Sequence, residues 1–204
     1  AVSIVGKLKQ VNAPGRPEES IAFRVAVLAS VVAGEVAVLR EGVGTPLLWL
    51  ACVVGTPLAF FMSHRTRHAD RFWLKVGIAA ALFVALARFA GMASSLEAAS
   101  IADVQIPLAE LFLWVQLLHG LDVPARRDLM FSLSSSVTLV IVAGVLSVDI
   151  SYAIYLSAWG VAALASLVLA HRSELGELRP LVPKGTAQLS AATRRQLRSL
   201  IGVG

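Results

Sequence analysis

Only 15% of the 204 residues are charged, 57% are hydrophobic, and the mean hydropathy is +0.76. A soluble domain carries about 25% charged residues, so this composition excludes an ordinary globular core and indicates a membrane protein. The formal charge of +5 does not indicate a nucleic-acid partner, because Lys and Arg fall at regular intervals between apolar runs and the few aromatic residues form no stacking platform.

Apolar runs near the length that crosses a hydrocarbon core about 30 Å thick recur along the chain. They predict an all-α bundle of six transmembrane helices within residues 21–170. The predicted spans are residues 21–39, 46–62, 72–92, 104–118, 129–147 and 150–170. Residues 1–20 are predicted to form a basic cytoplasmic tail and residues 171–198 a mostly irregular cytoplasmic linker. A basic cluster then precedes apolar residues 199–204, which we expect to begin a seventh span.

Small residues recur every fourth position in two of these spans and predict close helix packing. The first stripe is Ala22, Ala26, Ser30 and Gly34, and the second is Gly77, Ala81 and Ala85. Pro57 lies inside the second span and predicts a kink there. Pro57 is the one break that we predict among the spans, and we find no partner for it in the second half of the chain.

Basic residues set the predicted orientation, because cytoplasmic loops of membrane proteins are enriched in Lys and Arg. Of the 18 Lys and Arg residues, only Arg40 falls in a loop on the side opposite the N-terminal tail, and Arg88 falls within a span. Arg24, at the entry of the first span, and Arg71 and Lys75, at the second loop, count with the cytoplasmic side. The acidic residues on that opposite side are Glu41, Glu97, Asp103 and Asp149. We therefore predict a multi-pass protein of the cell membrane with both ends of this segment in the cytoplasm.

Glu35, Arg88 and Glu110 are ionisable residues predicted to lie inside the spans. A lone charge there costs about 2.5–3.5 kcal/mol, so such residues usually pair or face water. A rise of about 1.5 Å per residue places Glu35 and Arg88 at similar heights and Glu110 somewhat deeper. We predict that Arg88 pairs with Glu35 or with Glu110. A structural pair, an Arg88 that reaches the outer interface, and a substrate or proton path all remain open.

The turn between the fourth and fifth predicted spans carries Asp122, Arg126, Arg127 and Asp128 around Pro124. A helix that starts near Arg126 would place Asp128 in its first turn, where a negative charge suits the helix dipole. Arg126 and Arg127 also serve as topology anchors. Because this turn lies at the cytoplasmic face and Glu110 in the outer half of the membrane, we do not expect them to form one active centre. Docking of a cytosolic protein at the turn remains open.

His64 and His68 are four positions apart, a spacing that on a helix could hold a metal ion. Arg65 and Arg67 would repel a cation, and no carboxylate or thiol ligand accompanies the pair. We predict no metal site and no cofactor, and we expect this loop to face anionic lipid headgroups.

Cys52 and a serine cluster fall inside predicted spans. Apolar burial makes a thiol unreactive, so Cys52 is expected to pack, and as the single cysteine it forms no intrachain disulfide. The serines lack a hydrolase motif and are expected to form interhelical hydrogen bonds. They are Ser132, Ser134, Ser135 and Ser136.

Three segments carry a resemblance to a known family: APGRPEESIAFRVAVLAS, SHRTRHAD and PLAELFLWVQLLHGLDVPARRDLMFSLSSS. They resemble the N-terminal multi-pass region of bacterial membrane-anchored transglutaminase-like proteins, closest to those of high-GC Gram-positive bacteria. The resemblance implies an extracytoplasmic papain-like domain with a Cys-His-Asp triad, placed after a further span, and a role in the cell envelope. No triad residue transfers to this chain, since Cys52 lies in a span and the four His are predicted at the cytoplasmic side.

The resemblance implies that this chain anchors, and could regulate, a catalytic domain that begins beyond Gly204, so the segment itself should carry no catalytic site. Its partners would be the lipid bilayer, that following domain, and a membrane or cytosolic protein. Two alternatives stay open. One is a small transporter or channel that uses Glu35, Arg88 and Glu110; the other is a membrane scaffold that assembles envelope proteins through its small-residue stripes.

Overall fold

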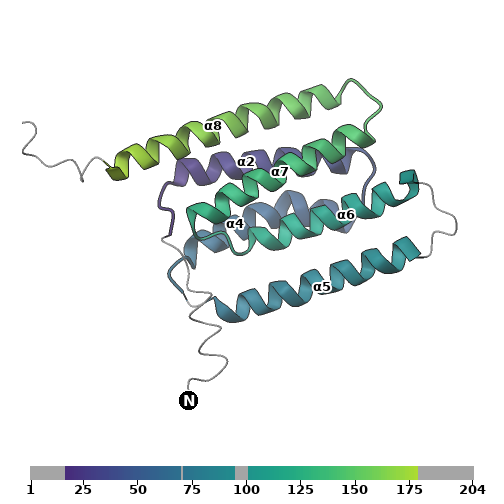
Figure 1. Ribbon diagram of the computed structural model, residues 1–204, viewed down its shortest axis with the longest axis horizontal. Helices are drawn as coiled ribbons and strands as arrows, with labels where there is room; N and C mark the ends of the chain where they lie inside the picture. Colours follow the sequence, from purple (N-terminus) through teal and green to yellow (C-terminus); the bar gives the residue numbers. More distant parts are fainter. Residues whose placement is uncertain (1–16, 70, 95–100, 179–204) are drawn as a thin grey trace, which may run out of the picture. The chain divides into compact units, whose positions relative to one another are not determined.

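The computed structural model describes residues 17–69, 71–94 and 101–178, and in these ranges the chain is almost entirely helical (Figure 1). The helices are α2 Ile21–Arg40, α3 Pro46–Leu50, the π-helical η1 Ala51–Gly55, α4 Thr56–Arg65, α5 Phe72–Ser94, α6 Ile101–Gly120, α7 Arg126–Leu146 and α8 Tyr152–Leu178. The predicted all-α class is confirmed. Most of the predicted basic tail, the linker from residue 179 onward and the predicted seventh span at 199–204 lie outside the described residues.

Among the described residues, five helices are long and apolar enough to cross a membrane: Ile21–Arg40, Pro46–Arg65, Phe72–Ser94, Arg126–Leu146 and Tyr152–Ser173. Their apolar surfaces face outward, as lipid-exposed helices require; Phe83 of α5, for example, is 74% exposed. α6 corresponds to the remaining predicted span, at residues 104–118. It contains Glu110 and also Pro107, a second proline inside a predicted span. α6 nevertheless continues as one α-helix through Pro107.

Side chains and glycines define the ends of the first two spans. The Ser20 hydroxyl accepts a hydrogen bond from the Phe23 N–H at 3.2 Å and so caps α2, and Thr45 caps α3 in the same way. The loop between them turns at Gly42 and Gly44, whose φ angles of 81° and 83° suit residues without a Cβ.

The predicted kink at Pro57 takes the form of a π-helical segment. Pro57 lacks an N–H, so the backbone just before it cannot keep the regular α-helical hydrogen-bond pattern. Residues Ala51–Gly55 instead form a π-helix between α3 and α4, and the three elements continue as one span. π-helical turns are frequent at functional sites, and Thr56 follows this one directly.

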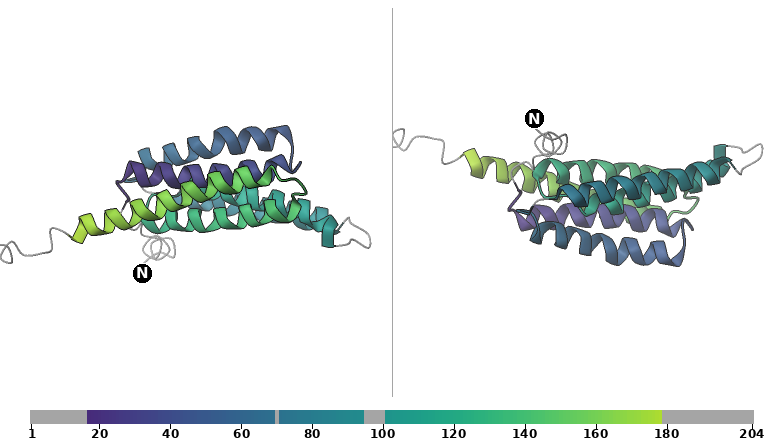
Figure 2. Two further views of the ribbon diagram at one scale, coloured as in Figure 1. Left: turned by 90° about the horizontal axis from the view of Figure 1, so that it is seen from above. Right: turned by 90° about the horizontal axis from the view of Figure 1, so that it is seen from below.

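The chain divides into two units, and the first ends at Ser166. Within this unit α2 packs closely along α7, as Figure 2 shows. A Cβ added at Gly34 would lie 3.2 Å from Leu139 Cβ and 3.2 Å from the Ser136 carbonyl oxygen. The predicted close approach is thus confirmed at Gly34. By contrast, a Cβ at Gly77 of the second stripe would meet nothing within 4 Å.

Helices extend beyond several predicted span limits. The second span continues from the predicted end at residue 62 to Arg65, and α7 begins at Arg126 rather than at residue 129. α8 runs to Leu178, so the linker expected to start irregularly at residue 171 is helical over its first residues. Hydropathy identifies only the apolar part of a helix, the part that can lie in the bilayer. The helical hydrogen bonds continue into the polar residues on either side, so the helices are longer than the predicted spans.

Candidate functional site

The turn between α6 and α7 is bound by two buried arginines that come from elsewhere in the chain. Arg24, near the start of α2, is 5% exposed. Its guanidinium donates to the Val123 carbonyl at 2.8 Å and to the Pro124 carbonyl at 3.3 Å. The Glu18 N–H also donates to the Pro124 carbonyl, at 3.0 Å. The start of α2 is therefore fixed to a turn about a hundred residues later in the sequence.

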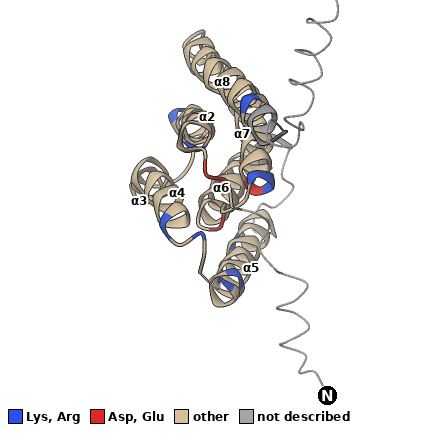
Figure 3. Ribbon diagram, turned by 90° about the vertical axis from the view of Figure 1, so that its left-hand side faces the viewer, with Lys and Arg blue, Asp and Glu red and all other residues tan. Residues whose placement is uncertain are grey.

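Arg71, in the loop after α4, holds the other side of the same turn. Its guanidinium donates to Asp122 Oδ1 at 2.8 Å and to the Ser63 carbonyl at 2.8 Å. It also bonds the hydroxyl and the carbonyl of Thr66. Ser63 Oγ accepts from the Val123 N–H at 3.0 Å. We call the set Arg24, Ser63, Arg71 and residues Asp122–Ala125 the arginine-bound turn; Figure 3 looks onto this end of the helices.

The start of α7 has the predicted geometry. The helix begins at Arg126, and Asp128 lies in its first turn. The Asp128 carboxylate accepts a hydrogen bond from the Ala125 N–H at 3.1 Å. Arg126 lies over the ring of Phe23, 5.9 Å from its centroid, and Arg127 is exposed. The four residues singled out at this turn thus have different roles: Asp122 and Asp128 bind inside the chain, while Arg127 faces outward.

The arginine-bound turn is suited to holding segments together rather than to chemistry. Its guanidiniums are directed at backbone carbonyls and one carboxylate inside the fold, which uses most of their donors. From the sequence, Asp122 was singled out as a charged residue of this turn. Arg24 and Arg71 were only counted among the basic residues that set the predicted orientation. One signal was available for Arg24: it lies inside an apolar run, directly after Phe23, where a charged side chain needs acceptors.

At the opposite end of the first unit, the turn between α7 and α8 is exposed and acidic. Hydrogen bonds from the side chain and then the backbone of Ser151 lower the pKa of Asp149. Asp149 therefore stays ionised at neutral pH. The turn keeps the negative charge that the orientation argument assigned to this side.

Arg88 of α5 pairs with Glu110 of α6. Their closest atoms, Arg88 Nη2 and Glu110 Oε1, are 3.1 Å apart, and the side chains are 57% and 13% exposed. The Trp114 indole N–H also reaches Glu110 Oε1, at 3.5 Å. Arg88 borders a cavity of about 390 Å³ between α5 and α6, which Trp114 and Leu118 also line. Of the two acidic partners predicted for Arg88, the structure brings it to Glu110.

Glu35 has a different partner. It is fully buried in α2, and its Oε1 accepts a hydrogen bond from the Thr56 hydroxyl at 2.8 Å. Its Oε2 has no hydrogen-bond partner among the described residues. Thr56 directly follows the π-helical segment, so the irregular backbone presents the hydroxyl that binds this carboxylate. The three intramembrane ionisable residues therefore divide into two separate contacts.

The remaining candidates for chemistry are held in structural contacts. Cys52 is fully buried in the core beside Leu48 and Leu113. His64 lies 3.4 Å from an Arg67 guanidinium nitrogen. In the part of the chain that the structure describes, no three His, Cys, Asp or Glu side chains gather as a metal site would require.

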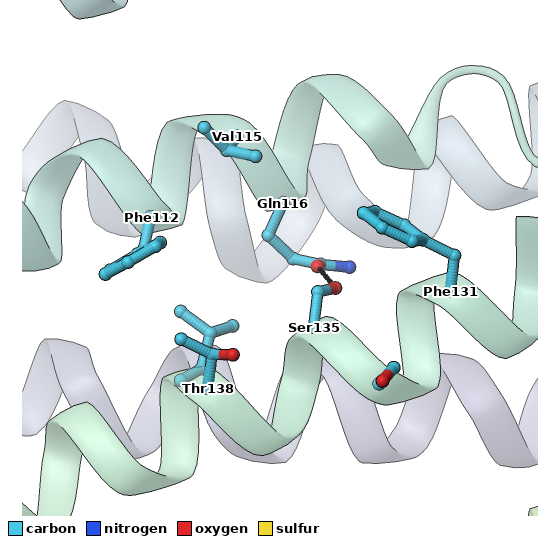
Figure 4. Close-up of a pocket in the computed structure, with 8 residues that line it drawn as sticks. Phe112, Val115, Gln116, Phe131, Ser135 and Thr138 are labelled. Atoms are coloured by element: carbon cyan, nitrogen blue, oxygen red, sulfur yellow. Dashed lines mark hydrogen bonds between the residues drawn. The ribbon is translucent and has the colours of Figure 1, made fainter.

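Two of the four serines of α7 form the expected interhelical hydrogen bonds, whereas the Ser132 hydroxyl has no partner among the described residues. The Trp159 indole of α8 donates to Ser136 Oγ at 2.9 Å. The Ser135 hydroxyl donates to Gln116 Oε1 of α6. Gln116, like Glu110, is a polar residue inside an apolar run, which indicates a place where helices meet. It borders a cavity between α6 and α7 (Figure 4).

Comparisons of the chain with protein-family models, with curated protein sequences and with solved structures found no match.

Proposed function

We propose that this chain is the multi-pass membrane anchor of a transglutaminase-like protein, with its papain-like catalytic domain following on the outer side of the membrane. The observation that carries the proposal is the arginine-bound turn. The three segments that resemble the family supply its parts except Arg71, which directly follows the second segment. Glu18 and Arg24 come from the first, Ser63 from the second, and Asp122–Ala125 from the third.

Segments that meet in one buried hydrogen-bonded centre constrain one another, since the loss of one partner leaves buried polar groups unsatisfied. Their common resemblance to one family is therefore stronger support than three unrelated similarities would be. The centre also suits an anchor, because it fixes the cytoplasmic ends of α2, α4 and α6 against one another.

The charge distribution supports the proposed orientation. Basic side chains surround the arginine-bound turn, among them the exposed Arg65 and Arg127, while the turn between α7 and α8 carries Asp149. Positive charge marks the cytoplasmic side, so the arginine-bound turn faces the cytoplasm. Both ends of the segment then lie on that side, and a further span would carry a following domain outside.

A transporter or channel needs polar groups along one path. Here Glu35 contacts Thr56 between α2 and α4, whereas Arg88 contacts Glu110 between α5 and α6. These contacts lie between different helix pairs, which favours structural roles for both over a shared path.

The coding sequence that follows residue 204 tests the catalytic half of the proposal. We expect an apolar span and then a soluble domain that contains the Cys, His and Asp of a papain-like triad. A stop codon, or a following domain without these residues, would contradict it.

Reconstituted liposomes test the anchor half. The purified chain should conduct neither protons nor small solutes above the level of protein-free vesicles. Flux that the substitutions Glu35→Gln or Arg88→Leu abolish would instead support the transporter alternative.

A further inference from the structure

A cavity of about 280 Å³ lies between α6 and α7. This volume is close to the lower limit of about 300 Å³ for small-molecule pockets. The cavity is lined by Phe112, Val115, Gln116, Phe131, Ser134, Ser135, Thr138 and Leu139. Phe131 is 55% exposed and Ser134 is exposed, so the cavity opens on the outer surface of the bundle, where α6 and α7 face the bilayer.

One polar group in this apolar wall lacks a partner. The Gln116 side chain is 2% exposed, and its Oε1 accepts a hydrogen bond from Ser135. Its amide nitrogen has no hydrogen-bond partner among the described residues. Figure 4 shows this nitrogen directed along the cavity toward Phe131. An amide N–H without an acceptor in apolar surroundings costs about 1–3 kcal/mol, so an occupant that supplies an acceptor oxygen would be stabilised there.

The position of Gln116 along α6 indicates the source of that oxygen. It lies one helical turn before Gly120, where α6 ends at the arginine-bound turn, and a turn is about 5.4 Å long. In a bilayer the ester carbonyls of a glycerolipid lie just inside its phosphates, at this depth. Exposed Arg127, near the start of the neighbouring α7, stands on the phosphate side.

We propose that this cavity binds a glycerolipid of the surrounding bilayer. One acyl chain fills the space between Phe112, Phe131 and Leu139, and its ester carbonyl accepts a hydrogen bond from the Gln116 amide. The site needs no catalytic domain, so a test of lipid binding says nothing about the transglutaminase-like assignment, and a failure of that assignment leaves the lipid site in place.

Diester and diether phosphatidylglycerol with the same chains provide the test, because the ether lipid fills the same space without a carbonyl acceptor. Both lipids are titrated into the purified chain, and binding is measured by native mass spectrometry. We expect the diester to bind about five- to tenfold more tightly, the effect of one net hydrogen bond of about 1–1.4 kcal/mol.

The variant Gln116→Met keeps the size of the side chain and removes the donor, so it should bind the two lipids equally. Gln105→Met, on the same helix and outside the cavity lining, is the matched control and should keep the ester preference. Should Gln116→Met not fold, a diester lipid with a photoreactive group near the ester replaces it, and the wild-type protein should be labelled at the cavity residues of α6 and α7.

Equal binding of diester and diether lipids by the wild-type protein would overturn the proposal. So would an ester preference that survives in Gln116→Met, or labelling confined to other helices. Preference for a hydroxyl-bearing lipid over the ester would show that the amide presents its oxygen to the cavity, and would overturn the proposal as well.

Discussion

At Glu35 a buried carboxylate depends on the single hydroxyl of Thr56, 2.8 Å away. The substitution Glu35→Gln should leave stability near that of the wild type, because glutamine keeps an acceptor oxygen at the same reach. Glu35→Leu removes the acceptor and should lower the free energy of unfolding by about 1–3 kcal/mol. Thermal unfolding in detergent, followed by tryptophan fluorescence, measures both effects.

The same contact predicts coupling between its two residues. Thr56→Val alone should destabilise, while Glu35→Leu combined with Thr56→Val should cost less than the sum of the single changes, because the pair has then been removed as a unit. Additive effects would show that Glu35 is held by something other than this hydrogen bond.

Arg71 is predicted to be the most sensitive position of the arginine-bound turn. Its guanidinium bonds Asp122, Ser63 and Thr66 together, so Arg71→Met should destabilise by about 1–3 kcal/mol by leaving buried acceptors unsatisfied, while Asp122 keeps Lys75 at 3.9 Å. Arg71→Lys should recover only part of the loss, since an ammonium cannot reach all of these acceptors at once.

The matched control is Arg65→Met. Arg65 is exposed and lies over the Phe61 ring at 5.3 Å, so its loss should cost under about 1 kcal/mol. Equal effects of Arg65→Met and Arg71→Met on the unfolding temperature would contradict a buried, cross-linking role for Arg71.

Some residue roles followed from sequence and others could not. Asp128 was predicted correctly because its role depends on its own helix start, which is local. The partner of Arg88 stayed open between Glu35 and Glu110, because residue spacing gives depth in the membrane but not the neighbour that each helix faces. Arg24 and Arg71 bind a turn distant in sequence, and charge counting alone cannot identify such acceptors.

Among the elements, the contact of α2 with α7 depends on Gly34. A Cβ there would lie 3.2 Å from both Leu139 Cβ and the Ser136 carbonyl oxygen, a separation too short for well-packed atoms. Gly34→Ala should therefore push the helices apart and destabilise by about 1–3 kcal/mol. Gly77→Ala has open space and should be neutral or stabilising by up to about 1 kcal/mol, the difference in helix propensity.

The two glycines thus provide an internal comparison for unfolding measurements. A cost for Gly77→Ala as large as that for Gly34→Ala would show that Gly77 packs closely too, against another copy of the chain or another membrane protein. Such a result would support the scaffold alternative, since α5 has little buried surface within this chain.

The sequence predicted where the helices lie, but it predicted their irregular segments only in part. The length of the apolar runs identified the spans, because a chain inside the bilayer must satisfy all its backbone N–H and C=O groups with its own hydrogen bonds, as a helix does. Pro57 indicated a break, but its position does not say that the backbone before it would become π-helical over Ala51–Gly55. Pro107 lies inside α6, within a span that the sequence described without a break.

For the whole molecule, every structural argument about function depends on which face of the bundle is cytoplasmic. Cysteine labelling in intact cells that express residues 1–204 tests this directly, because Cys52 is the single cysteine among these residues and is fully buried. In a Cys52→Ala background, cysteines placed at the exposed positions Arg127 and His68 should resist a membrane-impermeant maleimide. A cysteine at Val148, which is fully exposed beside Asp149, should react.

Permeabilised cells supply the control, because all three cysteines should then be labelled if each variant is folded and inserted. The reverse pattern in intact cells would place the arginine-bound turn outside and would overturn the proposed orientation, although the helix contacts would stand. If both His68→Cys and Val148→Cys are labelled in intact cells, the two positions lie on the same side of the membrane. An even number of spans would then separate them, instead of the three proposed. The three spans α5, α6 and α7 would then have to be reassigned, most directly by removing α6, which carries Glu110 and is not among the five candidate membrane spans found in the described residues.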